Sequence, residues 1–508
     1  MPNVDHRFQI HGPDQAAEVR ELLGSNRLGP TGPAAEVRRT WYDSFDGRLR
    51  SDGLTLCREM AAGRHRLVLS EGMAPVAASE AGPGDPSRTG LLPPGALRDR
   101  IAPVLEDRVL LPLAELVSRE RVTPVLNRDD KTVVRVILES RRIVRPRHQP
   151  LPATVTVRPL RGYVKEAERI AAILCADGRL RACPDGPAEE VLAVVGPAPV
   201  PTLNLELQPE LPSGAAVRAV LIRLLDIFEA NLDGTIRDLD TEFLHDLRVA
   251  VRRARSVLKL VGDVLGDDTH AHLAAELKWL GDLTTPTRDL DVYLADLQAQ
   301  EGAAAHADLE PFRRILAERQ AAAQAGLTRG LRSRRAKAVR ADWRAVGAEQ
   351  SEGPVARIPV GRLAAERTAK ALKRVSREGR SIGPGSPPED LHDLRKRCKE
   401  LRYLLEIFAS LHPRDAHKAV VGELKKLQDC LGQYQDGQVQ SEGLAHFAGE
   451  LMAAGRIPAE TILAMGALAA ELDRRQSDAR ARFATVFTRF DDAANRRRLL
   501  AMLEAARP

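Results

Sequence analysis

Two stretches of this 508-residue chain decide its fold: LHDLRVAVRRARSVLKL at 244–260 and LHDLRKRCKELRYLLEI at 391–407. Both begin with Leu-His-Asp-Leu-Arg, and a shift of 147 residues, from 244 to 391, keeps the chain in register without a gap over 244–292. An ungapped match of this length indicates duplicated helices with equal spacing. We therefore predict two helical subdomains related by a pseudo-twofold axis.

Each copy carries an apolar stripe and a basic stripe side by side when it is drawn as a helix at about 100° per residue. The apolar stripe predicts the face that packs on a core. The basic stripe contains no acid, and because like charges along one face repel, it needs an anionic partner. The alternative is a solvated charged face, which is less favoured because the stripe occurs in both copies. The stripe positions are His245, Arg248, Arg252, Arg255 and Lys259 in the first copy and His392, Arg395, Lys399 and Arg402 in the second.

Two further features of the repeat affect which side chains we assign to a site. The wheel places Arg253 on the far side of the first helix, and its match in the second copy is Glu400. We therefore expect this departure from the repeat to have little effect. His270 matches His417, and we expect both histidines to be structural rather than catalytic.

Composition and motifs exclude several classes of function. Lys and Arg number 76 and Asp and Glu 70, a net charge of +6, so a basic surface must come from local clustering. Five cysteines without a CxxC pair argue against a disulfide framework and indicate a reducing compartment. The chain has no P-loop, no nucleophile elbow and no HExxH motif. We predict no cofactor, no metal site and no catalytic residue.

The chain divides into parts by composition and periodicity. Residues 1–195 mix strand and helix signals and predict an α+β domain. A Pro-rich stretch at 196–212 predicts a linker. Helical periodicity then dominates 213–500 and predicts an all-α domain of two pseudo-twofold-related bundles, with repeats near 213–350 and 360–500.

Within the first domain, short apolar runs between turn residues predict strands at 38–60, 132–144 and 153–160. A helix is predicted at 165–175. The stretch 73–98 is rich in Pro, Gly and Ala and predicts a loop.

Helices that occur twice, begin with His-x-x-Arg and continue with spaced Arg and Lys resemble those of the CHAD family, the conserved histidine α-helical domain. The segments at 276–293 and 423–439 are similar to later helices of that family, so the resemblance covers roughly 213–500. It implies non-catalytic binding of inorganic polyphosphate in a basic groove or pore between the two halves. The predicted polyphosphate-binding residues are His245, Arg248, Arg252, Arg255, Lys259, Lys278, His392, Arg395, Lys396, Lys399, Arg402 and Lys425.

Polyphosphate also suits the two stripes on chemical grounds. Arginine offers forked donors to phosphate oxygens, and lysine adds a mobile point charge. Two related stripes can follow a long, flexible polyanion where one compact site cannot. Release of condensed counterions would supply much of the affinity, as it does for nucleic acids.

The segment RRTWYDSFDGRLRSDGLTLCREM at 38–60 resembles the CYTH family, which folds as a triphosphate tunnel. Some members hydrolyse triphosphate with acidic residues that hold a divalent metal. The family motif Glu-x-Glu-x-Lys is replaced here by Asp5, Arg7 and Gln9, and Glu139 is the one obvious strand acid that remains. Because Mg²⁺ and Mn²⁺ need clustered carboxylates, we predict a degenerate antiparallel β tunnel without enzymatic activity.

Two other functions stay open on the sequence. Basic helices also suit a duplex nucleic acid, although stacking aromatics for single strands are scarce. A triphosphatase acting through the N-terminal domain is the enzymatic alternative. With no signal peptide and no apolar run long enough to cross a bilayer, we expect a cytoplasmic protein without membrane contact, associated with polyphosphate granules. The oligomeric state and the preferred polyphosphate chain length are left undetermined.

Overall fold

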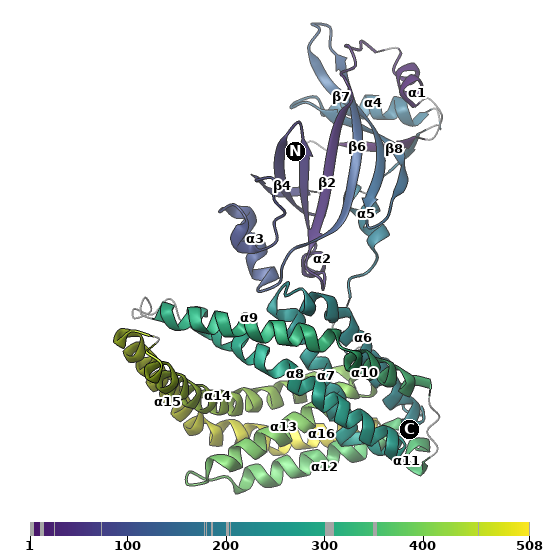
Figure 1. The fold of residues 1–508 in the computed structure, drawn as a ribbon. Coiled ribbons are helices and arrows are strands. Elements are labelled where there is room, and N and C mark those ends of the chain that lie inside the picture. The colour runs from purple at the N-terminus through teal and green to yellow at the C-terminus, as the bar shows by residue number, and fades with distance from the viewer. Residues whose placement is uncertain are drawn as a thin grey trace. The chain divides into compact units, whose positions relative to one another are not determined.

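The computed structural model describes residues 5–10, 15–24, 26–72, 74–176, 178, 180–183, 186–199, 203, 205–299, 309–348, 353–455 and 457–506. Internal contacts divide the chain into two compact units, Met1–Val200 and Pro201–Pro508. We describe each unit by itself. An α+β unit followed by an all-helical unit is the fold class that the sequence predicts, and it is confirmed (Figure 1). In the described part of the chain, no helix is both long and apolar enough to span a membrane.

The first unit is built on an antiparallel sheet whose described strands follow the order β5-β4-β3-β2-β6-β7-β8-β1-β9. The strands are β1 His6–Ile10, β2 Ala35–Asp43, β3 Leu54–Ala61, β4 Arg64–Glu71, β5 Ala74–Glu80, β6 Leu111–Leu126, β7 Thr132–Arg145, β8 Gln149–Pro159 and β9 Leu180–Ala182. The helices are α1 Gln15–Leu22, α2 Arg48–Ser51, α3 Ala96–Leu105, α4 Val164–Ala176 and α5 Pro187–Val195.

The two faces of this sheet differ in character because side chains alternate along each strand. One face is apolar: Phe8 and Val155 pair across β1 and β8 and pack with Ile170 of α4. We call the opposite face the inner face. It is covered at one end by Val191 of α5, which packs with Trp41 and other apolar side chains, and it is polar elsewhere.

The sequence prediction for 73–98 was wrong in part. Residues Ala74–Glu80 form β5, which pairs with β4, and Ala96–Leu105 form α3. Alanine-rich β5 lies at the edge of the described sheet, with mostly exposed residues. Its order therefore comes from backbone pairing with β4, which composition cannot reveal.

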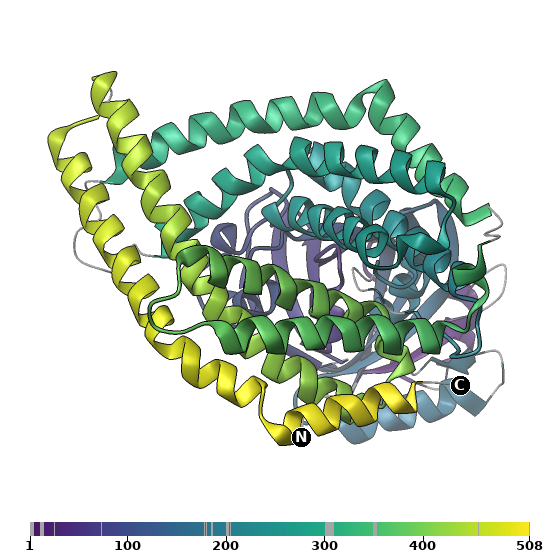
Figure 2. The same ribbon diagram turned by 90° about the horizontal axis from the view of Figure 1, so that it is seen from below.

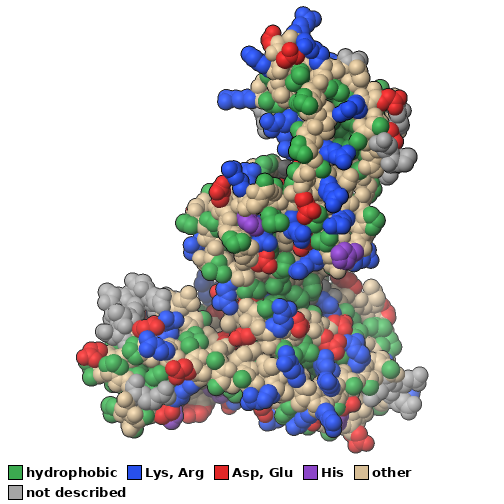
Figure 3. Space-filling view, turned by 45° about the horizontal axis from the view of Figure 1, so that its top comes forward, with side chains coloured by type: hydrophobic (Ala, Val, Ile, Leu, Met, Phe, Trp, Pro, Cys, Tyr) green, Lys and Arg blue, Asp and Glu red, His purple; other side chains and the backbone are tan. Residues whose placement is uncertain are grey.

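The second unit consists of long helices that pack in antiparallel pairs, with α14 and α15 side by side at one edge (Figure 2). We call α6–α11 the first half and α12–α16 the second half. The helices are α6 Ser213–Ile236, α7 Thr241–Val261, α8 Asp267–Ala299, α9 Glu310–Arg332, α10 Arg334–Ala345, α11 Pro354–Arg357, α12 Val360–Ser381, α13 Pro388–Ile407, α14 Arg414–Ala453, α15 Ala459–Phe490 and α16 Ala493–Ala505. Basic and acidic side chains are interspersed over this unit's surface in Figure 3.

The duplication extends to individual contacts. The ring nitrogen Nε2 of His270 lies 3.1 Å from the carbonyl oxygen of Leu258, and Nε2 of His417 lies 2.9 Å from that of Leu405. The residue numbers of the second pair are those of the first pair plus 147, the shift of the repeat. Each histidine therefore ties the start of one long helix to the end of the helix before it. The expectation that His270 and His417 are structural agrees with these contacts.

The two halves have separate cores that meet at α13. One core joins α6, α7, α8 and α10 and includes Leu404 and Phe408 from one side of α13. The other joins α12, α13, α14, α15 and α16 and includes Leu401 and Leu405. The α13 helix thus belongs to both cores, which fixes its position against α7.

The buried His412 of the second half has no histidine counterpart in the first half. It is buried in the turn before α14, where the first half has the buried Leu265. Burial, together with the His417 ring stacked 5.9 Å away, lowers the pKa of His412 to about 4. Because the folded-state pKa lies below the ordinary value, stability is complete above about pH 6.5 and falls as the pH drops towards 4.

We expect His412→Leu, which copies the first half, to remove this acid sensitivity. Between pH 8 and pH 5 the wild type should lose about 2 kcal/mol of unfolding free energy through this side chain, and the variant should be spared that loss. Urea unfolding at the two pH values measures the difference. The exposed His446 supplies the control, since His446→Leu should keep the wild-type profile. Equal pH dependence in wild type and His412→Leu would contradict the assignment.

Candidate functional site

The basic helices α7 and α13 pack against each other and, with α14, line a cavity of about 500 Å³ that is open to solvent on one side. We call it the central cavity. It draws on both copies of the repeat, because α7 lies in the first half and α13 and α14 in the second. The lining residues are Arg252, Arg253, Arg395, Lys399, Arg402, Tyr403, Glu406, Gln428, Asp429, Gly432, Gln433 and Asp436.

Both basic stripes reach the central cavity, through Arg252 in the first copy and Lys399, at the matching position, in the second. Burial and the nearby charges of Arg395 and Arg252 lower the pKa of Lys399 to about 8, and Asp436 only partly opposes them. In the first half, burial and the charges of Arg252 and Arg255 lower the pKa of Arg248 against the opposing effect of Asp289. Cations from both copies are therefore close enough to repel one another.

Acids inside the central cavity hold several of these cations. Arg395 donates to Asp436 at 3.2 Å, and Arg402 donates to Glu406 at 2.6 Å and to Gln428 at 3.2 Å. The cavity lining nevertheless contains five basic and three acidic side chains, so positive charge remains in excess.

Two ion pairs join the halves across the contact between α7 and α13. Arg253 of α7 pairs with Glu406 of α13 at 2.9 Å, and Lys259 pairs with Glu400 at 2.6 Å. The shift of 147 residues places Arg253 on Glu400 and Lys259 on Glu406. The two pairs are therefore related by the pseudo-twofold axis, with both bases in the first copy and both acids in the second.

These pairs correct two sequence-based interpretations. Arg253 was expected to point away from the stripe, but it lines the central cavity. Glu400 was expected to have little effect, but it binds Lys259 across the two halves and Arg397 on its own helix. The wheel treats α7 as an isolated helix, whereas α13 packs against the side on which it places Arg253.

The structure brings part of the predicted binding set into the central cavity and leaves the rest around it. Arg252, Arg395, Lys399 and Arg402 line the cavity. Arg248 lies deeper in the first half and donates to Thr284 at 2.9 Å and to Thr285 at 3.0 Å.

The remaining predicted side chains do not line the cavity. Lys259, Lys278 and Lys396 each pair with an acid, the last two with Asp282 and Asp393. The ring nitrogen Nδ1 of His392 lies 2.5 Å from Gln435 Oε1. His245 is partly buried, and Arg255 and Lys425 are exposed.

Sequence reasoning missed the acidic and amide part of the lining. Asp429 and Asp436 were visible as repeat matches of Asp282 and Asp289, but nothing in the sequence said that they face the stripe. Glu406 was detectable as an acid at the matching position of Lys259, where the second stripe ends. The available signal for Glu406 was that an acid replaces a base at this position of a repeat that is otherwise maintained.

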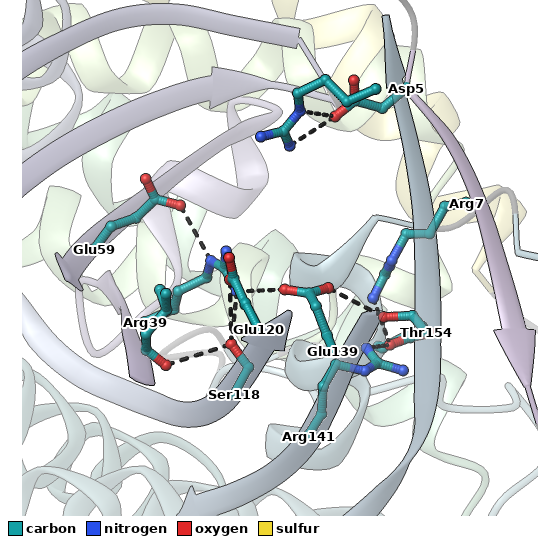
Figure 4. A network of polar contacts seen from close by, with 12 residues as sticks. Asp5, Arg7, Arg39, Glu59, Ser118, Glu120, Glu139, Arg141 and Thr154 are labelled. Carbon is teal, nitrogen blue, oxygen red and sulfur yellow. Dashed lines mark hydrogen bonds and ion pairs between the residues drawn. The ribbon is translucent and has the colours of Figure 1, made fainter. Parts of the chain in front are cut away.

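The inner face of the first unit is a second place where charged side chains converge (Figure 4). Arg39 of β2 donates to Glu59 at 3.1 Å, to Glu120 at 2.7 Å and to Glu139 at 3.1 Å. Strand pairing sets this arrangement, because Arg39 lies opposite Glu59 and Glu120 lies opposite Glu139. Ser118 accepts a further hydrogen bond from Arg39 at 3.2 Å. One guanidinium thus satisfies carboxylates from three strands.

The surroundings of Glu120 and Glu139 shift the pKa values of these two neighbouring carboxyls in opposite directions. Burial raises the pKa of Glu120 despite the charge of Arg39, and Glu139 raises it further. For Glu139, burial is outweighed by Arg39 and by hydrogen bonds from Glu120 and Thr154, so its pKa is lowered. Glu120 is therefore the member of the pair that takes up a proton first.

The first strand shows the alternation that the sequence predicts. Arg7 contacts Glu190 at 3.4 Å, Gln9 donates to Glu190 at 3.2 Å, and Asp5 accepts from Arg158 at 2.8 Å. Arg141 also pairs with Glu190. The inner face therefore carries its own counterions along the strand where the CYTH motif has glutamates.

The interpretation of Glu139 as the one obvious strand acid of this unit needs a correction. Glu59, Glu120 and Glu139 do gather, since all three reach Arg39. Composition along separate strands hid this, because the three residues come from β3, β6 and β7. In the part of the chain that the structure describes, no group of three or more His, Cys, Asp or Glu side chains is arranged to hold a metal ion.

Comparison with known proteins adds the following matches. Residues 219–445 match the family model described as the CHAD domain. A curated relative, the uncharacterized protein Rv2226 of Mycobacterium tuberculosis, is 28% identical over 289 residues, which cover 55% of this chain and 53% of the relative. The chain thus spans about half the length of that relative.

Solved structures resemble each unit separately. The CHAD domain from the plant Ricinus communis is 23% identical with a TM-score of 0.45, and covers 60% of this chain and 98% of its own. PptA from Streptomyces chartreusis is 19% identical with a TM-score of 0.44, and covers 55% and 99%. The putative adenylyl cyclase HpAC1 from Hippeastrum, described as having a dominant triphosphatase activity, is 11% identical with a TM-score of 0.29, and covers 38% and 96%.

Proposed function

Residues 219–445 are a CHAD domain, and from this premise we propose that the helical unit binds inorganic polyphosphate in the central cavity without catalysing a reaction. The observation that carries the proposal is the meeting of Arg252 of the first copy with Arg395 and Lys399 of the second in one cavity. Like charges so close together are unfavourable alone, and they become favourable when an anion lies between them.

The chemistry of the lining supports a phosphate chain as the anion. Arg252, Arg253, Arg395 and Arg402 offer planar donor forks, and Lys399 adds a point charge. Since the two copies contribute different members of this set, neither copy alone supplies the site. This explains why the basic helix occurs twice.

A duplex nucleic acid is the less favoured partner. A cavity of about 500 Å³ can admit a single phosphate chain, whereas a double helix would touch only its rim. Tyr403 is the aromatic side chain of the lining, and it is partly buried against the first-half core. One such side chain offers no series of stacking platforms for bases.

We also propose that the first unit is not an enzyme. Arg39 places a fixed positive charge among Glu59, Glu120 and Glu139, where a catalytic cation would need those carboxylates free. Arg7 and Arg141 likewise both pair with Glu190, so a triphosphate would have to displace a carboxylate to reach either arginine.

We expect charge reversal in either copy to weaken polyphosphate binding strongly. Arg248→Glu with Arg252→Glu, and separately Arg395→Glu with Lys399→Glu, replace attraction with repulsion at proposed phosphate contacts. Each pair should lower the affinity for long-chain polyphosphate and reduce the slope of log affinity against log salt concentration. Titration at several salt concentrations measures both quantities.

A matched control lies on α12, away from the cavity lining. Lys370→Glu with Lys373→Glu changes the net charge equally, and both lysines are exposed. This control should leave the affinity nearly unchanged. If reversal in one copy leaves binding and its salt slope intact, the site does not span the two copies.

Polyphosphate affinity should depend on pH through Lys399. With its pKa at about 8, Lys399 is charged at pH 7 and mostly neutral at pH 9, so affinity should fall about tenfold over this range at constant ionic strength. Lys399→Arg keeps its charge throughout and should remove the dependence, whereas Lys396→Arg should retain it. An unchanged pH profile in Lys399→Arg would refute this role.

The purified protein should release no phosphate from tripolyphosphate or ATP in the presence of Mg²⁺ or Mn²⁺. The physical reason is that Arg39 already occupies the carboxylates of Glu59, Glu120 and Glu139, so a metal ion would have to displace the guanidinium. A colorimetric phosphate assay provides the measurement. Metal-dependent release that disappears in Glu139→Ala would show that the first unit is a triphosphatase.

A further inference from the structure

Glu406 stands out in the central cavity because it is an acid bound to cations that face a proposed polyanion. Its two carboxylate oxygens pair with different arginines, Oε2 with Arg253 of α7 at 2.9 Å and Oε1 with Arg402 of α13 at 2.6 Å. Its side chain is 18% exposed, so solvent screens these pairs only in part. Glu406 thus occupies two of the five cations in the cavity, and Asp436 occupies a third, Arg395.

Glu400 provides an internal reference for this arrangement. It occupies the position related to Arg253 by the repeat, and it pairs with Lys259 at 2.6 Å across the same helix contact. Its side chain is also mostly buried, at 11% exposed. Glu400 does not line the central cavity. The two glutamates therefore share the task of joining the halves, and Glu406 alone of the pair faces the anion site.

We propose that Glu406 is a specificity-determining residue of the central cavity, which engages Arg253 and Arg402 and thereby disfavours short phosphate anions relative to long polyphosphate chains. This inference rests on the proposed function and concerns which members of the polyphosphate class are bound.

A short anion and a long chain find their contacts in different places. A short anion such as tripolyphosphate must obtain all of its contacts inside the cavity, where it meets the Glu406 carboxylate and competes with it for the two arginines. A long chain extends beyond the cavity and gains cations that Glu406 does not contact, among them Arg248 and Arg255. The same internal competitor therefore removes a larger share of the binding of the short anion.

The test compares Glu406→Gln with Glu400→Gln in the full chain by calorimetric titration with tripolyphosphate and with long-chain polyphosphate. Glutamine keeps the shape and removes the charge. Glu406→Gln should tighten tripolyphosphate binding about tenfold. This factor corresponds to about one charge-assisted hydrogen bond that the anion gains when Glu406 no longer competes for Arg253 and Arg402. It should tighten long-chain binding by a smaller factor. Glu400→Gln should leave the tripolyphosphate affinity unchanged, because Glu400 does not line the cavity.

Thermal melting separates this effect from a change in structure. Both variants lose an ion pair between the halves, so their melting temperatures should fall by similar amounts. The inference is overturned if Glu406→Gln fails to tighten tripolyphosphate binding, if it tightens both ligands equally, or if Glu400→Gln does the same. A wild-type protein that binds no polyphosphate of any length would instead overturn the proposed function.

Discussion

Repulsion between the cations of the two copies is the constraint on which the helical unit depends. Packing α7 against α13 places Arg252 and Lys399 in one cavity, and apolar contacts between the helices do not screen the repulsion between these charges. The ion pairs Arg253–Glu406 and Lys259–Glu400 flank the meeting point and supply opposite charge across the same contact. They allow the halves to close while an excess of positive charge remains inside the cavity.

The first unit handles buried charge in the opposite way. On its inner face each guanidinium already has a carboxylate, as with Arg39 and Glu139 or Arg141 and Glu190, and hydroxyls such as Thr154 complete the hydrogen bonds. Buried groups satisfied in this manner stiffen a sheet but offer little to an incoming ion. The contrast between a face whose guanidiniums are already paired and a cavity with surplus positive charge is the reason why we place the proposed anion site in the helical unit.

Sequence periodicity predicted the helices, the duplication and four cavity-lining cations, because each of these follows from spacing along one helix. It failed for Arg253, whose surroundings are set by a helix 153 residues away, at Glu406. It also failed for the cluster around Arg39, since Glu59, Glu120 and Glu139 come from three strands whose register is decided by the whole sheet. Contacts between different helices or strands depend on the tertiary structure. A single sequence shows only where each residue lies along its own helix or strand.

The departures from the repeat then acquire a physical meaning. Had the second copy kept bases at positions 400 and 406, the pseudo-twofold contact would have set Arg253 against a base and Lys259 against another base. The four bases at positions 253, 259, 400 and 406 would then add to the repulsion between Arg252 and Lys399. The helices would separate or bind anions from solution. Replacing both bases by glutamate in one copy resolves both contacts at once, because the axis relates them. The chain thus keeps bases at matching positions such as Arg252 and Lys399, and it breaks the repeat at the two positions where α7 and α13 form ion pairs.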